Sequence, residues 1–182
     1  MTVKPTPLKD CFIIEPKVFK DERGSFFESF NYNTFKKHTG LDIDFVQDNQ
    51  SISQYGTIRG LHFQTGEFSQ AKLIRVAQGK VLDVVVDMRP NSETYLKQFS
   101  YILTGENNHQ LFVPRGFAHG FACLSSEAIF VYKCDNYYHK ASESGISYKD
   151  EALAIDWHIP KKEQIVSDKD QNLPTLDSYL NS

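Results

Sequence analysis

The residues of this chain best suited to acid–base chemistry lie in two short segments, each built around a histidine. Residues 59–64 read RGLHFQ, and residues 114–121 read PRGFAHGF. Lys72 follows the first histidine by ten residues, and Tyr132 follows the second by thirteen. Imidazole titrates near neutral pH, with an ordinary pKa of about 6.5. A base, two cations and a phenol in these segments indicate proton transfer on an anionic intermediate.

Strand signals dominate the regions that must position these residues. The β-branched runs Lys72–Ala77 and Lys80–Met88 flank Gln78-Gly79, which predicts a hairpin turn. Many short strands with regular turns are typical of an antiparallel sandwich or barrel. Further short strands are predicted at residues 99–103, 110–113, 120–124 and 128–133.

Helical signals are confined to two places. Residues 33–38, followed by Gly40, predict a short helix with a glycine at its end. A weaker helical turn is predicted near Glu163. The sequence shows no internal repeat or linker, so we expect one domain over residues 1–182.

Strand alternation assigns the candidate residues to faces, because side chains two apart point to the same side. It places His62 opposite Leu61, and it places Lys72, His119 and Tyr132 beside apolar neighbours of their own strands. If these faces point into one barrel, the polar groups converge in a mostly apolar cavity. Such a cavity is the usual form of a small-molecule site.

Composition excludes several classes of protein. A hydrophobic content of 40% can build a full core, and a net charge of −3 gives no electrostatic support for nucleic-acid binding. No apolar run approaches the roughly 20 residues of a membrane span, and the N-terminus has no apolar signal region. The three cysteines form no CxxC pair, so we expect free thiols and a cytoplasmic protein.

The second histidine segment resembles the second motif of the cupin barrels, with the pattern Pro-x-Gly-x-x-His at residues 114–119. The first cupin motif requires two histidines one residue apart, and here Gln64 replaces the second one. Glu67 could still join the two histidines as a two-histidine, one-carboxylate metal site. Lys72 would bring positive charge towards such a cation, so we expect no bound metal.

A longer series of motifs runs from about residue 12 to residue 174. In order and spacing these blocks resemble the dTDP-4-dehydrorhamnose 3,5-epimerase family. The resemblance implies an all-β, cupin-type jelly-roll barrel with short flanking helices. The blocks are DERG-x-F-x-E at 21–28, QDNQS-x-S at 47–53, G-x-x-RGLHFQ at 56–64, Q-x-KL at 70–73, residues 114–121, Tyr132-Lys133, Glu143, Asp156-Trp157 and S-x-KD at 167–170.

The resemblance also implies a chemistry. The family's substrate is a dTDP-linked 4-keto-6-deoxy sugar, in which loss of the C3 or C5 proton gives an enolate. By resemblance His62 is the base, and Asp170 holds its ring and stabilises the imidazolium. Lys72 would face the enolate oxygen, and Tyr132 would return a proton from the opposite face. No cofactor is implied, because the ketone itself is the electron sink.

Substrate binding is carried over in the same way. The family is a homodimer in which N-terminal segments complete the partner's site, and we expect this of the region around Arg23 and Phe26. Arginine suits phosphate because its planar fork bonds two oxygens at once. The residues that match the family's substrate-binding positions are Arg23, Phe26, Glu28, Gln47, Asp48, Asn49, Arg59, His119, Glu143 and Lys169.

The sequence therefore predicts an isomerase that inverts C3 and C5 on the route to dTDP-L-rhamnose, a sugar of surface polysaccharides such as O-antigen. Three alternatives stay open. The first is an epimerase acting at C5 only or C3 only, and the second is a metal-dependent cupin enzyme. The third is a non-catalytic sugar-binding cupin, against which the combination of a base, a cation and an acid argues.

Overall fold

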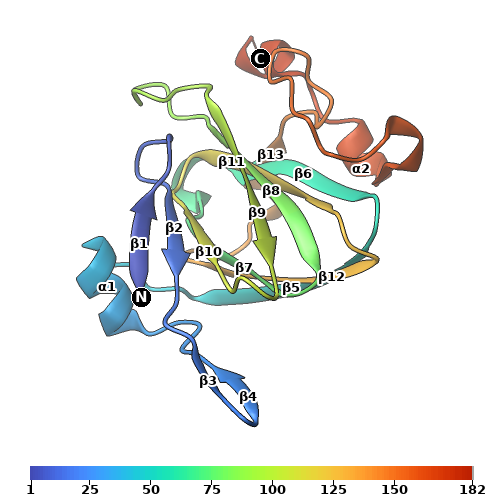
Figure 1. The fold of residues 1–182 in the computed structure, drawn as a ribbon. Helices are drawn as coiled ribbons and strands as arrows, with labels where there is room; N and C mark the ends of the chain where they lie inside the picture. The colour runs from blue at the N-terminus through green and yellow to red at the C-terminus, as the bar shows by residue number, and fades with distance from the viewer. Residues whose placement is uncertain (182) are drawn as a thin grey trace.

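Two antiparallel sheets face each other and form a barrel in the computed structural model, which describes residues 1–181 (Figure 1). Ser182, the last residue of the predicted domain, lies outside the described residues. The first sheet contains, in spatial order, β1 (Thr2–Pro5), β2 (Phe12–Glu15), β10 (Gln110–Val113), β7 (Lys72–Gln78), β12 (Glu127–Cys134) and β5 (Gln47–Gln54).

The second sheet lies against the first and has one parallel pair. Its antiparallel strands are, in order, β13 (Glu143–Gly145), β6 (Thr57–Gln64), β11 (Phe117–Cys123), β8 (Lys80–Asp87) and β9 (Gln98–Thr104). The short strand β14 (Ile165–Val166) runs parallel to β6. All-β architecture of the cupin jelly-roll type, with short flanking helices, is thereby confirmed.

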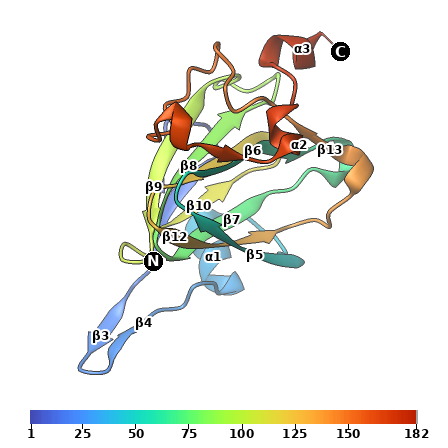
Figure 2. The same cartoon turned by 90° about the vertical axis from the view of Figure 1, so that its right-hand side faces the viewer.

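A two-stranded hairpin stands apart from both sheets. Strands β3 (Phe19–Asp21) and β4 (Gly24–Phe26) pair only with each other, and both views show them projecting away from the barrel (Figures 1 and 2). The aromatic rings of Phe19 and Phe26 are more than half exposed on it. Two exposed aromatic rings that pair across one hairpin are unusual in solvent unless another surface covers them.

The helices are short, and the predicted helix is confirmed as α1 (Tyr32–Thr39). The Asn31 side chain accepts a hydrogen bond from the Thr34 amide at its start, and Gly40 ends it with a φ of 74°. A 3₁₀ turn over Lys161–Glu163 confirms the predicted turn near Glu163. The remaining helical segments are α2 (Asp168–Gln171), α3 (Leu176–Leu180) and the 3₁₀ turns η1 (Gly66–Phe68) and η2 (Lys140–Ser142).

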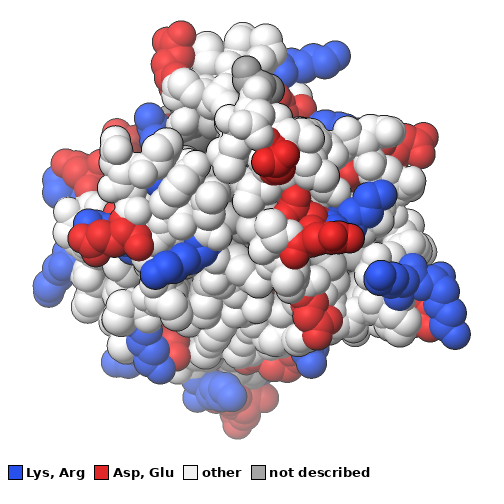
Figure 3. All heavy atoms as spheres, turned by 90° about the horizontal axis from the view of Figure 1, so that it is seen from above, with Lys and Arg blue, Asp and Glu red and all other residues white. Residues whose placement is uncertain are grey.

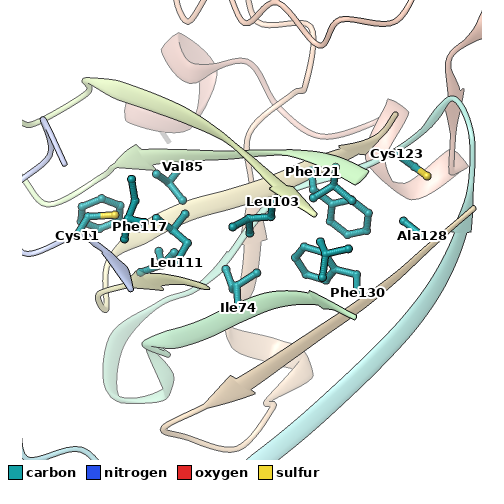
Figure 4. Packing of buried hydrophobic residues seen from close by; sticks show 14 of the residues in the cluster. Cys11, Ile74, Val85, Leu103, Leu111, Phe117, Phe121, Cys123, Ala128 and Phe130 are labelled. Carbon is teal, nitrogen blue, oxygen red and sulfur yellow. The ribbon is translucent and has the colours of Figure 1, made fainter. Parts of the chain in front are cut away.

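Hydrophobic clusters fill three layers. The central one lies between the two sheets, where Phe121 and Phe130 stack with ring centroids 4.1 Å apart (Figure 4). A second cluster covers the outer face of the second sheet with C-terminal residues such as Trp157. A third packs α1, through Phe35, on the outer face of the first sheet. Strands such as β8 are therefore buried on both faces, which explains why most of their residues are apolar.

The predicted hairpin at Gln78-Gly79 is wrong. Strands β7 and β8 both exist with nearly the predicted limits, but β7 pairs with β10 and β12, whereas β8 pairs with β9 and β11. Gly79, with a φ of 81°, carries the chain from one sheet to the other. A turn and two alternating strands look the same in the sequence whether the strands pair or cross between sheets.

Two further findings bear on the surface. No helix within residues 1–181 is long and apolar enough to cross a membrane. On the face seen in Figure 3, acidic and basic side chains are interspersed rather than gathered into one basic surface. That pattern agrees with the small net charge of the chain.

Candidate active site

A cavity of about 450 Å³ lies between the two sheets, and its floor includes Phe121 and Phe130 of the central cluster. Each sheet contributes one set of polar side chains to it. Most of the predicted site residues converge here: His62, Lys72, Tyr132 and Asp170, together with Gln47, Asn49, Arg59, His119, Glu143 and Lys169.

His62 forms a hydrogen-bonded pair with Asp170. Its Nε2 lies 2.6 Å from Oδ1 of Asp170, whose Oδ2 accepts a hydrogen bond of 3.1 Å from the Gly60 amide. Burial alone would raise the pKa of Asp170, but the hydrogen bonds from His62 and Gly60 outweigh it and hold that pKa below its ordinary value. An ionised carboxylate only accepts hydrogen bonds, so Nε2 carries the proton and Nδ1 is left as the basic nitrogen.

Asp170 reaches this position because of a short helix that the sequence analysis did not predict. Ser167 caps α2, and its hydroxyl accepts a hydrogen bond of 3.2 Å from the Asp170 amide. Strand β14, just before the cap, pairs with β6 and so brings the segment beside His62. A loop-like sequence is thereby held against the cavity wall.

Arg59 and His62 both line the cavity, although simple alternation puts residues three apart on opposite faces. His119 pairs with His62 and Phe121 pairs with Arg59, so β6 contains one extra residue, a β-bulge. The bulge lies at Gly60, which has a φ of 115°. A Cβ atom at this glycine would lie 2.6 Å from Cα of Gly120, so the bulge needs a residue without a side chain.

Lys72 and Tyr132 project from the first sheet, opposite His62. Nζ of Lys72 lies 5.9 Å from the centroid of the Tyr132 ring. Burial lowers the pKa of Lys72 and raises that of Tyr132. Within residues 1–181 no carboxylate lies within ion-pair distance of the Lys72 ammonium, and the phenol keeps its proton well above neutral pH. The pair can therefore offer one positive charge and one acid proton to a bound molecule.

His119 lies beside His62 on the neighbouring strand β11. Its Nε2 is 3.1 Å from Oδ2 of Asp83, and it is almost fully buried. Burial holds the pKa of His119 below its ordinary value, so the ring is neutral at physiological pH. Because Nε2 donates to Asp83, Nδ1 of the neutral ring can accept one hydrogen bond from a ligand.

The mouth of the cavity is a network of polar side chains. Glu143 accepts hydrogen bonds from Nζ of Lys169, at 2.6 Å, and from the Tyr138 hydroxyl, at 3.0 Å. Burial would raise the pKa of Glu143, but these two partners keep it below its ordinary value. Nearby, Gln47 donates to Oδ1 of Asn49 at 3.0 Å and accepts from the Tyr138 amide. Cations and amides of this kind suit a ligand with phosphate and sugar oxygens.

The predicted residues that do not line this cavity lie in three places. Arg23 and Phe26 lie on the projecting hairpin, where Arg23 pairs with Asp21 at 2.6 Å. Glu28 lines a separate cavity of about 190 Å³ beside α1. Asp48 lies between the cavity-lining residues Gln47 and Asn49 of β5 and pairs instead with Lys133, at 2.9 Å. The structure does not bring these four residues to the site of their own chain.

The alternative metal triad does not form. Glu67 is exposed on η1 and does not line the cavity that holds His62 and His119. Over residues 1–181 no three side chains of His, Cys, Asp or Glu are grouped closely enough to hold a metal ion. Gln64, at the position of the missing cupin histidine, instead donates to the carbonyls of Phe68 and Tyr137.

Two buried residues near the site were not singled out from the sequence. Cys134 lines the cavity and is the cross-strand partner of Lys72. Asp83 lies behind His119 and is fully buried. A signal for Asp83 exists, because it is a lone charge inside the apolar run Val81–Val86 of a buried strand.

Comparisons with known proteins agree with this geometry. The family model described as dTDP-4-dehydrorhamnose 3,5-epimerase matches residues 5–178. The Escherichia coli K12 protein of that name is 48% identical over 99% of this chain and 97% of its own length.

Solved structures give the same result. The epimerase of that name from Elizabethkingia anophelis superposes with a TM-score of 0.94 at 53% identity, covering 98% of this chain and 97% of that one. A dTDP-6-deoxy-D-glucose-3,5-epimerase from Legionella pneumophila, in complex with dTDP-4-keto-L-rhamnose, gives 0.93 at 45% identity, with 97% and 93% covered. The cavity with its His62–Asp170 pair therefore lies in a chain that belongs to the dTDP-4-dehydrorhamnose 3,5-epimerase family.

Proposed function

We propose that this enzyme inverts C3 and C5 of a dTDP-linked 4-keto-6-deoxy sugar, converting dTDP-4-dehydro-6-deoxy-D-glucose into dTDP-4-dehydro-L-rhamnose. The observation that carries the proposal is the placement of a base and an acid on opposing sheets of one cavity. His62 projects from the second sheet, and Tyr132 projects from the first. The Legionella relative described above, bound to dTDP-4-keto-L-rhamnose, supports this choice of substrate.

Proton removal is the role of His62. The C4 ketone makes the hydrogens on C3 and C5 acidic, because the electron pair left on carbon moves into the carbonyl oxygen. Nδ1 of His62 takes the proton, and the ionised Asp170 stabilises the imidazolium that forms. General-base assistance of this kind contributes about 10²–10⁴-fold in rate.

Stabilisation of the enolate is the role of Lys72. Its ammonium is buried and has no carboxylate at ion-pair distance among the described residues, so it can face the negative charge that develops on O4. A fixed charge in a water-poor site is worth more than the same charge in water, because it needs no reorganisation when the reaction occurs.

Inversion requires a proton from the face opposite the base, and this is the role of Tyr132. The phenol donates its proton to carbon while the enolate returns its electron pair, so the ketone is restored. Phenolate and imidazolium then exchange protons with solvent. A proton returned by His62 would only regenerate the starting sugar, which is why the two groups must lie on opposing sheets.

Substrate binding falls to the remaining cavity residues. Gln47, Asn49, Arg59, His119, Glu143 and Lys169 would hold the sugar and diphosphate. We propose further that the enzyme is a homodimer, in which the hairpin carrying Arg23 and Phe26, together with Glu28, completes the partner's cavity. The exposed aromatic rings of that hairpin support this arrangement. The role of Asp48 in binding stays a prediction.

The chemistry needs no metal or cofactor, since the substrate's own ketone accepts the electron pair. The three thiols are free and buried, which agrees with action in the cytoplasm. There the product would be an intermediate of dTDP-L-rhamnose synthesis.

A single-carbon epimerase is the second candidate, because a structural relative from Streptomyces bikiniensis, with a TM-score of 0.90 and 31% identity, is a 3'-monoepimerase. Proton NMR of dTDP-4-keto-6-deoxyglucose in D₂O, with chelator-dialysed enzyme, reports exchange at C3 and C5 separately. We expect exchange at both carbons, and none with His62→Ala. Exchange at one carbon would favour the second candidate, and activity restored by a single divalent metal would overturn the mechanism.

A further inference from the structure

The buried carboxylate of Asp83 lies beside the cavity, and the mechanism does not use it. Asp83 lies on β8, faces the interior between the sheets and has no exposed surface. Its Oδ2 is 3.1 Å from Nε2 of His119. Its Oδ1 is buried and has no hydrogen-bond partner among residues 1–181.

A buried carboxylate with a free oxygen is costly unless a positive charge lies nearby. His119 does not supply that charge at neutral pH, because burial keeps its ring neutral. The nearby cation is Lys72, whose ammonium projects into the same interior from the opposing sheet. His119, which is hydrogen-bonded to Asp83, lines the same cavity as Lys72, so only one side chain separates the carboxylate from that cavity. The negative charge of Asp83 opposes the lowering of the Lys72 pKa by burial.

We propose that Asp83 is a positioning residue of this active site: its buried carboxylate, hydrogen-bonded to His119 behind the cavity wall, provides the negative charge that holds the proton on the ammonium of Lys72. Asp83 does not line the cavity, so it acts without touching the substrate. The inference rests on the proposed function only for its consequence in catalysis, because the charge of Lys72 can be measured without turnover.

The other groups that face Lys72 do not replace Asp83. Cys134, its cross-strand partner, has a pKa raised to about 11 by burial and is a neutral thiol. Glu143 also acts on Lys72, but its two oxygens already bind Lys169 and Tyr138. Tyr132 presents its ring to the ammonium and remains a neutral phenol. Asp83 is therefore the facing carboxylate whose charge is not paired with another cation.

The direct test is an NMR titration of the Lys72 side chain in protein labelled with ¹³C-lysine, with Lys72→Arg identifying the signal. We expect Asp83→Asn, which is nearly isosteric, to lower the titration midpoint of Lys72 by about one pH unit or more. A folded Asp83→Asn protein in which Lys72 titrates as in the parent would overturn the proposal.

Asp87→Asn is the matched control. Asp87 lies on the same strand, is equally buried and does not appear among the charges acting on Lys72. We expect this variant to lose stability and to leave the Lys72 titration where it was. An equal shift in both variants would show a general loosening of β8 and would contradict a specific role. Should Asp83→Asn fail to fold, Asp83→Ser keeps a polar partner for His119 at smaller volume. The Lys72 titration is then measured in Asp83→Ser, with the same expected shift.

The pH dependence of kcat provides a second test. In Asp83→Asn the alkaline limb of the kcat profile should move to lower pH, because Lys72 loses its proton earlier. In the Lys72→Arg background the same substitution should leave that limb unmoved, since a guanidinium does not titrate in this range. A shift that persists with Arg at position 72 would assign the limb to another group and overturn the proposal. If the parent enzyme shows no epimerisation, the proposed function fails while the NMR result still decides the role of Asp83.

Discussion

At the scale of single residues, burial shifts the pKa values of Tyr132 and Lys72, the two proposed catalytic groups of the first sheet, in opposite directions. It raises the pKa of Tyr132, so the phenol keeps the proton that it must donate, and it lowers the pKa of Lys72, whose charge is then sensitive to its neighbours. His62 on the opposing sheet is held by an ionised Asp170. The proposed acid and the proposed base thus face each other from opposing walls of one cavity.

Replacing Tyr132 with Phe should separate the two halves of the reaction. Proton removal by His62 does not use the phenol, so solvent deuterium should still exchange into the substrate while inversion at C5 falls. NMR of the exchanging substrate measures both quantities in one sample. Parallel loss of exchange and inversion would instead mean that Tyr132 positions the sugar.

Replacing Lys72 with Met should act through charge rather than packing. The methionine keeps an unbranched stem and removes the ammonium, so kcat should fall by roughly 10²–10³-fold, as when one oxyanion donor is removed elsewhere. Steady-state kinetics and a thermal melt measure the two effects, and we expect little change in the melt. Normal turnover would leave Arg59 as the group that stabilises the enolate.

Strand alternation predicts only part of the candidate site. Alternation put Lys72, His119 and Tyr132 beside apolar neighbours, and the structure shows that these faces point into the cavity. Alternation alone would put Arg59 on the face opposite His62, because it does not allow for the extra residue in β6. The pairing of Asp170 with His62 was available only through the family resemblance, since 108 residues separate the two in the chain.

At the scale of elements, the bulge in β6 decides whether Arg59 and His62 share the cavity. We expect Gly60→Ala to be strongly destabilising and nearly inactive, because its Cβ would lie 2.6 Å from Cα of Gly120 and 2.7 Å from the carbonyl oxygen of His119. Gly40→Ala is the matched control. Gly40 also has a positive φ, but nothing lies within 4 Å of its Cβ position.

The Gly40→Ala control should lower the free energy of unfolding by only about 1 kcal/mol and keep full activity. Chemical denaturation and kinetic assays of both variants make the comparison. Equal losses in the two variants would mean that positive φ alone, and not the close approach of β11, accounts for Gly60.

The loop between β8 and β9 is held by Asp87. Burial would raise the pKa of this carboxyl, but hydrogen bonds from Arg89, Ser92 and Thr94 lower it from 3.8 to about 2. The depressed pKa stabilises the fold above pH 3.8, and the contribution disappears as the pH falls towards 2. Asp87→Asn should therefore cost about 2 kcal/mol at neutral pH.

Urea denaturation of the parent and Asp87→Asn proteins at several pH values measures this contribution. The difference in unfolding free energy should be constant near neutral pH and shrink below pH 3.8. A difference that stays constant in acid would show that the amide disturbs packing rather than removing a charge.

Element prediction succeeded where the signal is local. Alternation and turn residues located β7 to β12, and the spacing of polar residues and Gly40 located α1. The pairing of β7 and β8 was wrong, because the choice between a hairpin and a crossing depends on the facing sheet and not on the turn. Helix α2 was missed because four residues give too little periodicity to detect.

At the scale of the whole molecule, the jelly roll supplies two walls, and the hairpin of β3 and β4 leads away from both (Figure 2). Arg23 on this hairpin does not reach the cavity of its own chain. If it completes the partner's cavity in the proposed dimer, two inactive variants should complement each other. Arg23→Ala should bind substrate poorly, and His62→Ala should bind it without turnover. Each variant alone should be nearly inactive.

Mixing the two variants under conditions that exchange subunits should restore activity. In a mixed dimer, the Arg23→Ala chain has an intact His62 and receives Arg23 from its His62→Ala partner, so one of the two cavities is complete. The activity of the mixture, followed against time of exchange, measures this. Lys20→Ala, on the same hairpin and likewise not lining the cavity, should be active without mixing. A mixture that stays inactive although mass spectrometry detects mixed dimers would place Arg23 in the site of its own chain and remove the hairpin from the partner's cavity.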